Sequence, residues 1–201
     1  DGATAERLVG VPGEGSIELF IRPAPTPGSM FDRVMSFPKD TVFAKTLSLE
    51  LKAGEPDSRR RIETQVLHFD GREFRAYTYG WNNDGTDAAL VAAEGDERRI
   101  EVTDAAAPGG KRVLRWTYAG RVQCLQCHNP WARHTLAFNT LQLNRYHDYG
   151  GVRRNQLEVL RELGIFVPAA DGAEQRRARQ DWFTSQQALI DPHDASAPLP
   201  A

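Results

Sequence analysis

Hydrophobic and polar positions alternate through much of the first 120 residues, which is the pattern of strands with one buried face. Leu47, Leu49 and Leu51 recur at a period of two, and two runs rich in β-branched and aromatic residues follow them. Asp70-Gly71 separates those two runs, and this dipeptide is typical of two-residue hairpins. We expect strands at residues 41–51, 61–69, 72–81, 88–93, 98–102 and 112–118. Together they predict an antiparallel sheet, sandwich or partial barrel.

The pattern changes after residue 120, where apolar residues begin to recur at helical spacing. Val152, Val159 and Leu163 fall near one helical face, and Gly164 stands where a C-terminal cap would. We expect helices at residues 138–146, 152–163 and 173–189. The sequence therefore predicts an α+β fold with a β-rich N-terminal half and C-terminal helices.

The composition is that of a globular protein, with 201 residues of which 40% are hydrophobic and 26% charged. The net charge of −2 argues against a nucleic-acid platform or a polybasic membrane surface, and no apolar run approaches the roughly 20 residues of a membrane span. We predict one domain over residues 1–190, β-rich over 1–120 and with the motif described next and the helices over 121–190. The proline-containing residues 191–201 are expected to be a linker toward a further, downstream region.

The two cysteines of the chain, Cys124 and Cys127, stand directly before His128 in the arrangement C-x-x-C-H. This is the attachment sequence of c-type haem. Each thiol adds to one vinyl group of the porphyrin, and the adjacent histidine supplies an axial imidazole to the iron. The sequence therefore predicts one covalently bound haem c per chain, with His128 as the proximal ligand.

Three other interpretations of the cysteine pair are a redox-active dithiol, a zinc site and a structural disulfide. A redox pair is usually found in a βαβ setting of the thioredoxin kind, which the strand pattern here lacks. A structural zinc site needs four ligands, and a second cysteine pair is missing. Covalent haem is the favoured interpretation, and because haem is attached to thiols outside the cytoplasm, we expect a bacterial protein that is periplasmic or secreted.

The second axial ligand of the iron is not marked by a motif. Small c-type cytochromes commonly use a methionine downstream of the histidine, but Met30 and Met35 both lie upstream. His147 follows His128 in a loop-like segment with the reach to fold over the distal face, so we predict His147 as the distal ligand, with Met35 next. The remaining possibilities are His68, His134, His193 or an open position.

Several segments occur in an order that is similar to a known family. They are FPKDTVFAKT (37–46), RRIET (60–64), YGWNNDGTDA (79–88), CLQCH (124–128), LQLNR (141–145) and NQL (155–157). Together they resemble bacterial secreted c-type cytochrome modules that are fused or adjacent to sugar-dehydrogenase-like β-propeller (PQQ) domains. The resemblance implies Cys124 and Cys127 as thioether sites and His128 as the proximal iron ligand. A second C-x-x-C-H tends to follow in that family, so we expect this chain to be the first haem module of a longer protein.

The expected function is that of a monohaem c-type cytochrome domain, an electron-transfer module rather than an enzyme, without the usual all-α cytochrome c fold. Its partners would be a dehydrogenase domain or protein and a downstream cytochrome, and the fragment is expected to be monomeric. One alternative is a haem site with an open sixth position that acts as an enzyme or gas sensor. Another is a haem-free carbohydrate-binding β domain that uses Tyr77, Tyr79 and Trp81. Residues 81–87 are predicted to form a structural turn locked by Asx hydrogen bonds.

Overall fold

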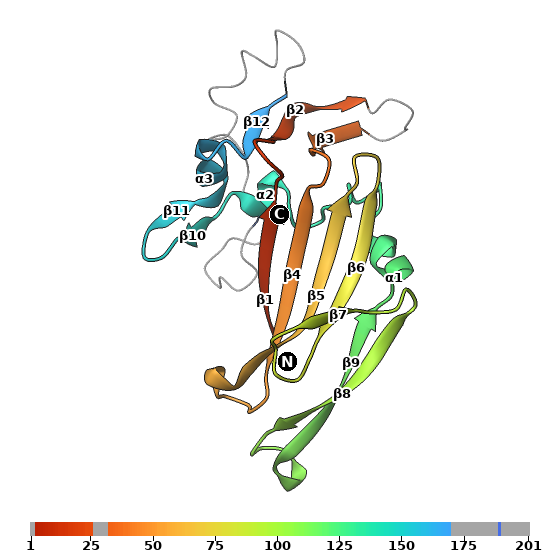
Figure 1. Ribbon diagram of the computed structural model, residues 1–201. Helices are drawn as coiled ribbons and strands as arrows, with labels where there is room; N and C mark the ends of the chain where they lie inside the picture. The colour runs from red at the N-terminus through yellow and green to blue at the C-terminus, as the bar shows by residue number, and fades with distance from the viewer. Residues whose placement is uncertain (1–2, 26–31, 170–188, 190–201) are drawn as a thin grey trace, which may run out of the picture. The chain divides into compact units, whose positions relative to one another are not determined.

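The computed structural model describes residues 3–25, 32–169 and 189, which belong to two compact units (Figure 1). The first unit contains residues 1–13 and 38–129, and the second contains residues 14–37 and 130–201. Strands dominate both units and the helices are few and short, which agrees with the predicted β-rich α+β character. No helix within the described ranges is long and apolar enough to cross a membrane.

A five-stranded antiparallel sheet forms the body of the first unit, in the order β1-β4-β5-β6-β7 (Figure 1). Its strands are β1 (Ala3–Gly10), β4 (Val42–Glu50), β5 (Arg59–Phe69), β6 (Phe74–Trp81) and β7 (Ala88–Leu90). A turn at Asp70-Gly71 does join β5 to β6, and Gly71 has a φ of 96°. The expected two-residue loop is too short, however, because Phe69 pairs with Phe74 and the loop spans residues 70–73. The Asp70 carboxylate accepts hydrogen bonds from the N–H groups of Glu73 and Arg72 and from the Arg75 guanidinium, which together hold its pKa well below the usual range.

A β-bulge interrupts β5 near its start. Leu47 of β4 pairs with Glu63 but the next residue, Ser48, pairs with Arg61, so Ile62 is an extra residue on β5. The strand alternation therefore breaks, and Ile62 and Glu63 are both buried although they are consecutive. On the far side of the bulge, Arg61 takes the face that it shares with Ser48.

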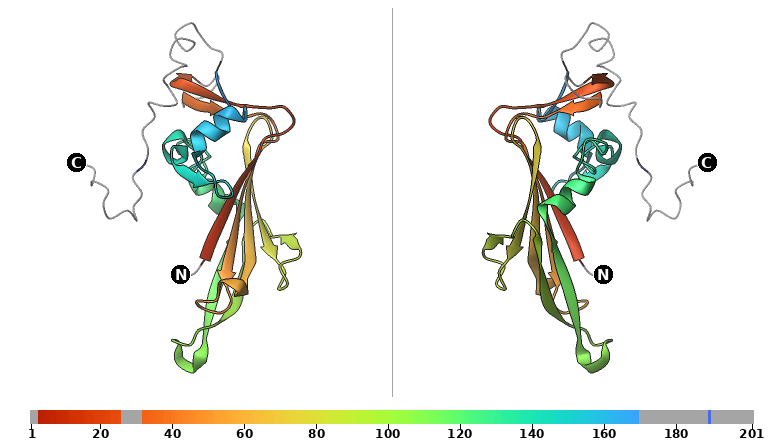
Figure 2. Two further views of the ribbon diagram at one scale, coloured as in Figure 1. Left: turned by 90° about the vertical axis from the view of Figure 1, so that its left-hand side faces the viewer. Right: turned by 90° about the vertical axis from the view of Figure 1, so that its right-hand side faces the viewer.

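The hairpin of β8 (Gly95–Thr103) and β9 (Lys111–Ala119) supplies the rest of the first unit's core. Its inward side chains Ile100, Val102 and Tyr118 form one buried cluster with Leu49 and Ile62. Short 3-10 turns occur at Pro56–Ser58 and Pro108–Gly110. The helix α1 (Arg121–Cys127) contacts β6 on one side of the sheet, and β7 with the loop before it projects from the other side (Figure 2).

The second unit is built around a three-stranded sheet in the order β12-β2-β3. Its strands are β2 (Ile17–Pro25), β3 (Asp32–Ser36) and β12 (Phe166–Pro168), and β12 runs parallel to β2. Ile17, Leu19, Leu157 and Phe166 are fully buried, and the Phe166 ring lies 5.5 Å from that of Phe138. A small hairpin of β10 (Tyr146–Asp148) and β11 (Arg153–Asn155) and the helices α2 (Thr140–Leu143) and α3 (Gln156–Glu162) complete the unit.

The predicted C-terminal helices are too long in two cases. The helix expected at residues 152–163 is α3 alone, because Gly150 and Gly151 adopt positive φ angles and reverse the chain into the β10–β11 hairpin. The side chain of Asn155 then caps α3 by accepting hydrogen bonds from the N–H groups of Leu157 and Glu158. The helix expected at residues 138–146 is only α2, which Asn139 caps in the same way. The helix expected at residues 173–189 lies outside the described residues, apart from Leu189.

The motif at residues 124–128 belongs to the first unit, with the sheet, and not with the helices of residues 138–163. The reason is that α1 follows β9 directly and contacts β6. The single domain over residues 1–190 stays a prediction, and the linker at residues 191–201 lies outside the described residues.

We expect Leu49→Ala to lower the free energy of unfolding by about 2–5 kcal/mol, because Leu49 is 2% exposed in the cluster that joins the hairpin to the sheet. Leu8→Ala is the matched control, since Leu8 is 62% exposed on the neighbouring strand β1 and its loss should change stability by no more than about 0.5 kcal/mol. Urea unfolding followed by tryptophan fluorescence measures both values. Equal effects of the two substitutions would contradict this core.

Candidate functional site

The helix α1 that carries the C-x-x-C-H motif begins where the backbone of Gly120 makes a close approach. A Cβ atom on Gly120 would lie 2.6 Å from the carbonyl oxygen of Glu94 and 2.9 Å from that of Ala93. The next residue, Arg121, donates its N–H to the same Ala93 carbonyl at 2.8 Å. Only glycine leaves room for this contact, so the first turn of α1 is fixed against the segment between β7 and β8.

The three residues of the motif lie on one side of α1. Cys124, Cys127 and His128 stand at positions i, i+3 and i+4, which share about 100° of helical arc. The helix ends at Cys127, and His128 is its C-cap, whose N–H donates to the Cys124 carbonyl at 3.0 Å. Cys127 is exposed, whereas Cys124 and His128 are half-buried. The helix therefore presents two thiols and one imidazole toward the same side.

The surroundings of Cys124 come from the sheet and were not predicted from the sequence. Partial burial raises the pKa of the Cys124 thiol, a hydrogen bond with Thr78 opposes that shift, and the charge of Glu63 adds to it. Thr78 also donates its hydroxyl to the Ala119 carbonyl at 2.9 Å. The buried Glu63 carboxylate accepts hydrogen bonds from the Trp116 indole at 2.8 Å and from the Gln65 amide at 2.9 Å. The thiol is consequently held more protonated than an ordinary cysteine.

The donor set of α1 fits the chemistry of covalent haem c. The two thiols are not joined in a disulfide, so both are available for thioether formation, and the imidazole lies one residue beyond the second thiol. Within the part of the chain that the structure describes, no three His, Cys, Asp or Glu side chains are grouped as metal ligands. Both cysteines are free thiols in the structure, and no further described His, Cys, Asp or Glu joins them as a group of metal ligands.

The candidate distal ligands are distributed over both units. Met35 lies half-buried on β3 and His147 lies exposed on β10, where its ring packs edge-on against that of Tyr149 at 4.8 Å. Both belong to the second unit, as does His134, whereas the motif belongs to the first. His68 of the first unit contacts the Asp40 carboxylate at 3.0 Å, and His193 lies outside the described residues. The assignment of His147, or else Met35, stays a prediction.

The predicted Asx turn at residues 81–87 is confirmed. The Asn82 side chain accepts hydrogen bonds from the N–H groups of Thr86 and Asp87. Trp81 is committed to internal contacts, because its indole donates to Thr64 at 2.9 Å and the Arg61 guanidinium lies 3.9 Å from its ring centroid. An aromatic ring covered in this way is a poor platform for a sugar, and the carbohydrate-binding alternative, which also names Tyr77 and Tyr79, stays a prediction.

We expect the pKa of Cys124 to lie above the usual value of about 8.5 for a free thiol. It can be measured in haem-free protein that carries the Cys127→Ser substitution, where the rate of Cys124 alkylation should rise with pH around this pKa. Glu63→Gln removes a negative charge beside the thiol and should lower that pKa. The measurement is the pH profile of iodoacetamide labelling, with protein unfolded in guanidinium as the reference. An unchanged or raised pKa in Glu63→Gln would show that the charge of Glu63 does not act on Cys124.

The chain matches no known protein-family model, and neither the curated protein sequences nor the solved structures contain a significant match to it.

Proposed function

We propose that this chain is a monohaem c-type cytochrome module that transfers electrons. The observation that carries the proposal is the C-x-x-C-H motif on a single side of α1, with both thiols outside any disulfide. Cys124 and Cys127 would hold the porphyrin through two thioether bonds, and His128 would bind the iron. A bound haem c supplies an iron that alternates between its ferric and ferrous states.

The protein's contribution is to hold the attachment residues in place. The contact of Gly120 with the Ala93 and Glu94 backbone ties the start of α1 to the first unit, and the helix contacts β6. Residues on a helix that is held in this way keep their geometry when the charge beside them changes, which favours electron transfer. Glu63 adds a buried, hydrogen-bonded carboxylate whose charge acts on Cys124.

The proposal also implies redox partners, because of the chemistry of such a module. A module with one haem accepts and passes on single electrons, so it needs a donor and an acceptor. We propose a fused or separate dehydrogenase as the donor and another cytochrome as the acceptor. Thioether attachment to reduced thiols takes place outside the cytoplasm, so the proposed location is periplasmic or secreted.

Expression with a cytochrome c maturation system should give haem that stays on the chain after denaturation, measured by haem staining and by the reduced pyridine spectrum. Cys124→Ser or Cys127→Ser should leave one thioether bond and shift the reduced pyridine band, and the double variant should lose essentially all covalent haem. Gln126→Ser is the matched control, because Gln126 is exposed on the same helix and should keep wild-type loading. Wild-type protein that stays haem-free under these conditions would refute the proposal.

For the distal ligand, we expect matured wild-type protein to be low-spin and slow to bind carbon monoxide. His147→Ala should become high-spin and bind carbon monoxide rapidly, because it opens the sixth position, and Met35→Leu should leave the spectrum unchanged. His68→Ala is the control for a histidine that is engaged elsewhere. If the wild type is already high-spin and binds carbon monoxide, the assignment of His147 fails and a haem site with an open sixth position, as in an enzyme or gas sensor, is favoured.

A further inference from the structure

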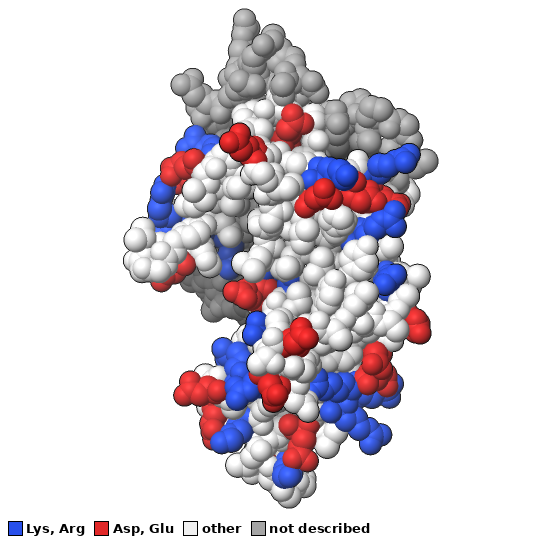
Figure 3. Space-filling view, viewed as in Figure 1, with Lys and Arg blue, Asp and Glu red and all other residues white. Residues whose placement is uncertain are grey.

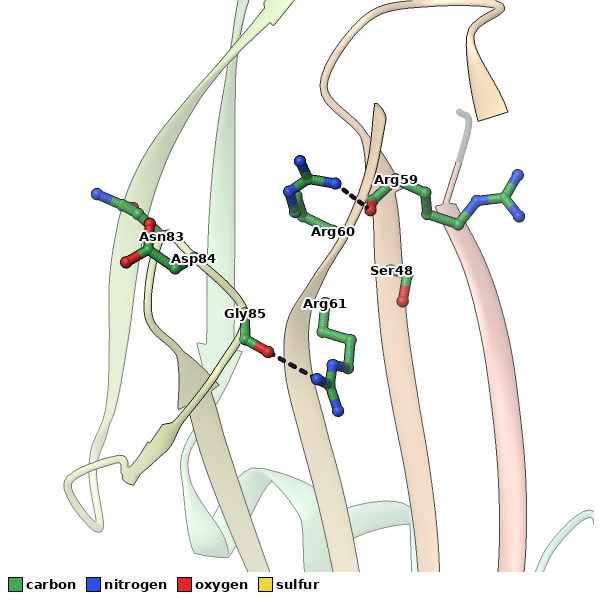
Figure 4. Close-up of a pocket in the computed structure, with 7 residues that line it drawn as sticks. All are labelled: Ser48, Arg59, Arg60, Arg61, Asn83, Asp84 and Gly85. Carbon is green, nitrogen blue, oxygen red and sulfur yellow. Dashed lines mark hydrogen bonds between the residues drawn. The ribbon is translucent and has the colours of Figure 1, made fainter. Parts of the chain in front are cut away.

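An open pocket of about 710 Å³ lies on the first unit between the start of β5 and the loop from β6 to β7 (Figure 4). Its walls are Ser48 of β4, the three consecutive arginines Arg59, Arg60 and Arg61, and residues 83–85 of the loop. None of the motif residues Cys124, Cys127 and His128 lines it. The pocket is therefore a feature separate from the proposed haem site.

The loop wall of this pocket is held rigidly. Arg61 donates to the Gly85 carbonyl at 2.6 Å, as Figure 4 shows, while its guanidinium stacks on the Trp81 ring. Arg98 donates to the Trp81 carbonyl at 2.7 Å and also to the Asn83 side chain. Two guanidinium groups thus hold the turn, Arg98 at its start and Arg61 at Gly85.

The charges around the pocket are not balanced. Arg59 points away from the loop and pairs with the Glu50 carboxylate at 2.7 Å, which neutralises it (Figure 4). Arg60, by contrast, donates only to the neutral backbone carbonyl of Arg59, at 3.0 Å. The oxygens that accept from Arg61 and Arg98 are also neutral carbonyl or amide groups, and a carbonyl satisfies a donor without cancelling its charge.

Among the described residues, then, no carboxylate forms an ion pair with Arg60, Arg61 or Arg98. Asp84 is the one acidic side chain on the walls, so the pocket carries a net positive charge. On the face that Figure 3 shows, Lys and Arg are interspersed with Asp and Glu. Elsewhere on the first unit several basic residues have a close acidic partner, such as Arg115 with Glu97 and Lys111 with Glu101.

We propose that this pocket is a docking site for an acidic segment of a partner protein. The planar guanidinium of the exposed Arg60 matches a carboxylate with two parallel hydrogen bonds, and the half-buried Ser48 adds a hydroxyl to the walls of the pocket. An open pocket suits a chain that passes across the surface better than an enclosed small molecule, and arginine is enriched at such interfaces. The site does not depend on bound haem.

The test is fluorescence anisotropy of a fluorescein-labelled peptide of alternating glycine and glutamate, with the same peptide carrying glutamine as the uncharged probe. We expect the glutamate peptide alone to bind, and more weakly as salt is added. Arg60→Gln should weaken its binding about tenfold, the loss of one charge-assisted contact. Arg72→Gln removes the same charge from an exposed arginine at the opposite end of β5 and should change binding less than about twofold.

Two results would overturn the proposal. Equal weakening by Arg60→Gln and Arg72→Gln would mean that only net charge attracts the peptide. The pocket would instead be a site for small anions if a few equivalents of inorganic phosphate displaced the peptide fully and if Arg60→Gln also weakened the binding of phosphate. Circular dichroism of both variants checks that the sheet is intact, and Arg60 is suited to substitution because it holds no part of the loop.

Discussion

One inserted residue in β5 determines much of the first unit. Because Ile62 is extra to the pairing with β4, two consecutive side chains turn toward the β8–β9 hairpin. Ile62 fills the apolar cluster and Glu63 meets the Trp116 indole, so the bulge supplies both the apolar and the polar contact that hold the hairpin. The same insertion sends Arg61 to the opposite face, where it fixes the β6–β7 loop. The surroundings of Cys124 and the basic pocket thus have a common origin.

The strands around Asp70-Gly71 were predictable because their signals are local: a period of two, β-branched residues and a turn that only a few dipeptides favour. The C-terminal helices were predicted too long because apolar residues at helical spacing outweighed Gly150 and Gly151, whose positive φ angles turn the chain into a hairpin. Strands β2 and β12 were not assigned. These two strands pair in parallel although most of the chain separates them in sequence. A pairing between such distant segments produces no periodic sequence pattern from which it could be predicted.

The candidate site was predictable where a motif encodes it, at Cys124, Cys127 and His128. What surrounds the motif was not, because it depends on tertiary contacts. Glu63 has the sequence pattern of an ordinary polar strand residue, and only the structure shows that it is buried and bonded to the Trp116 indole. Gly120 marks a change of pattern in the sequence, and only the structure shows its contact with Ala93. A Gly followed three residues later by Gln was a weak local sign that a helix begins, and the Gln123 side chain does accept the Gly120 N–H.

Neither unit is a continuous stretch of chain, and this determines the order in which the two units can be completed during synthesis. The first unit begins with β1, is interrupted by residues 14–37, and resumes at residue 38. The second unit acquires β2 and β3 early, but its sheet lacks β12 until Phe166 has been made. Contiguous domains can fold one after another as they leave the ribosome, whereas here the second must wait for its last strand. All residues of the first unit, Cys124 and Cys127 included, are therefore synthesised before the second unit can close its core.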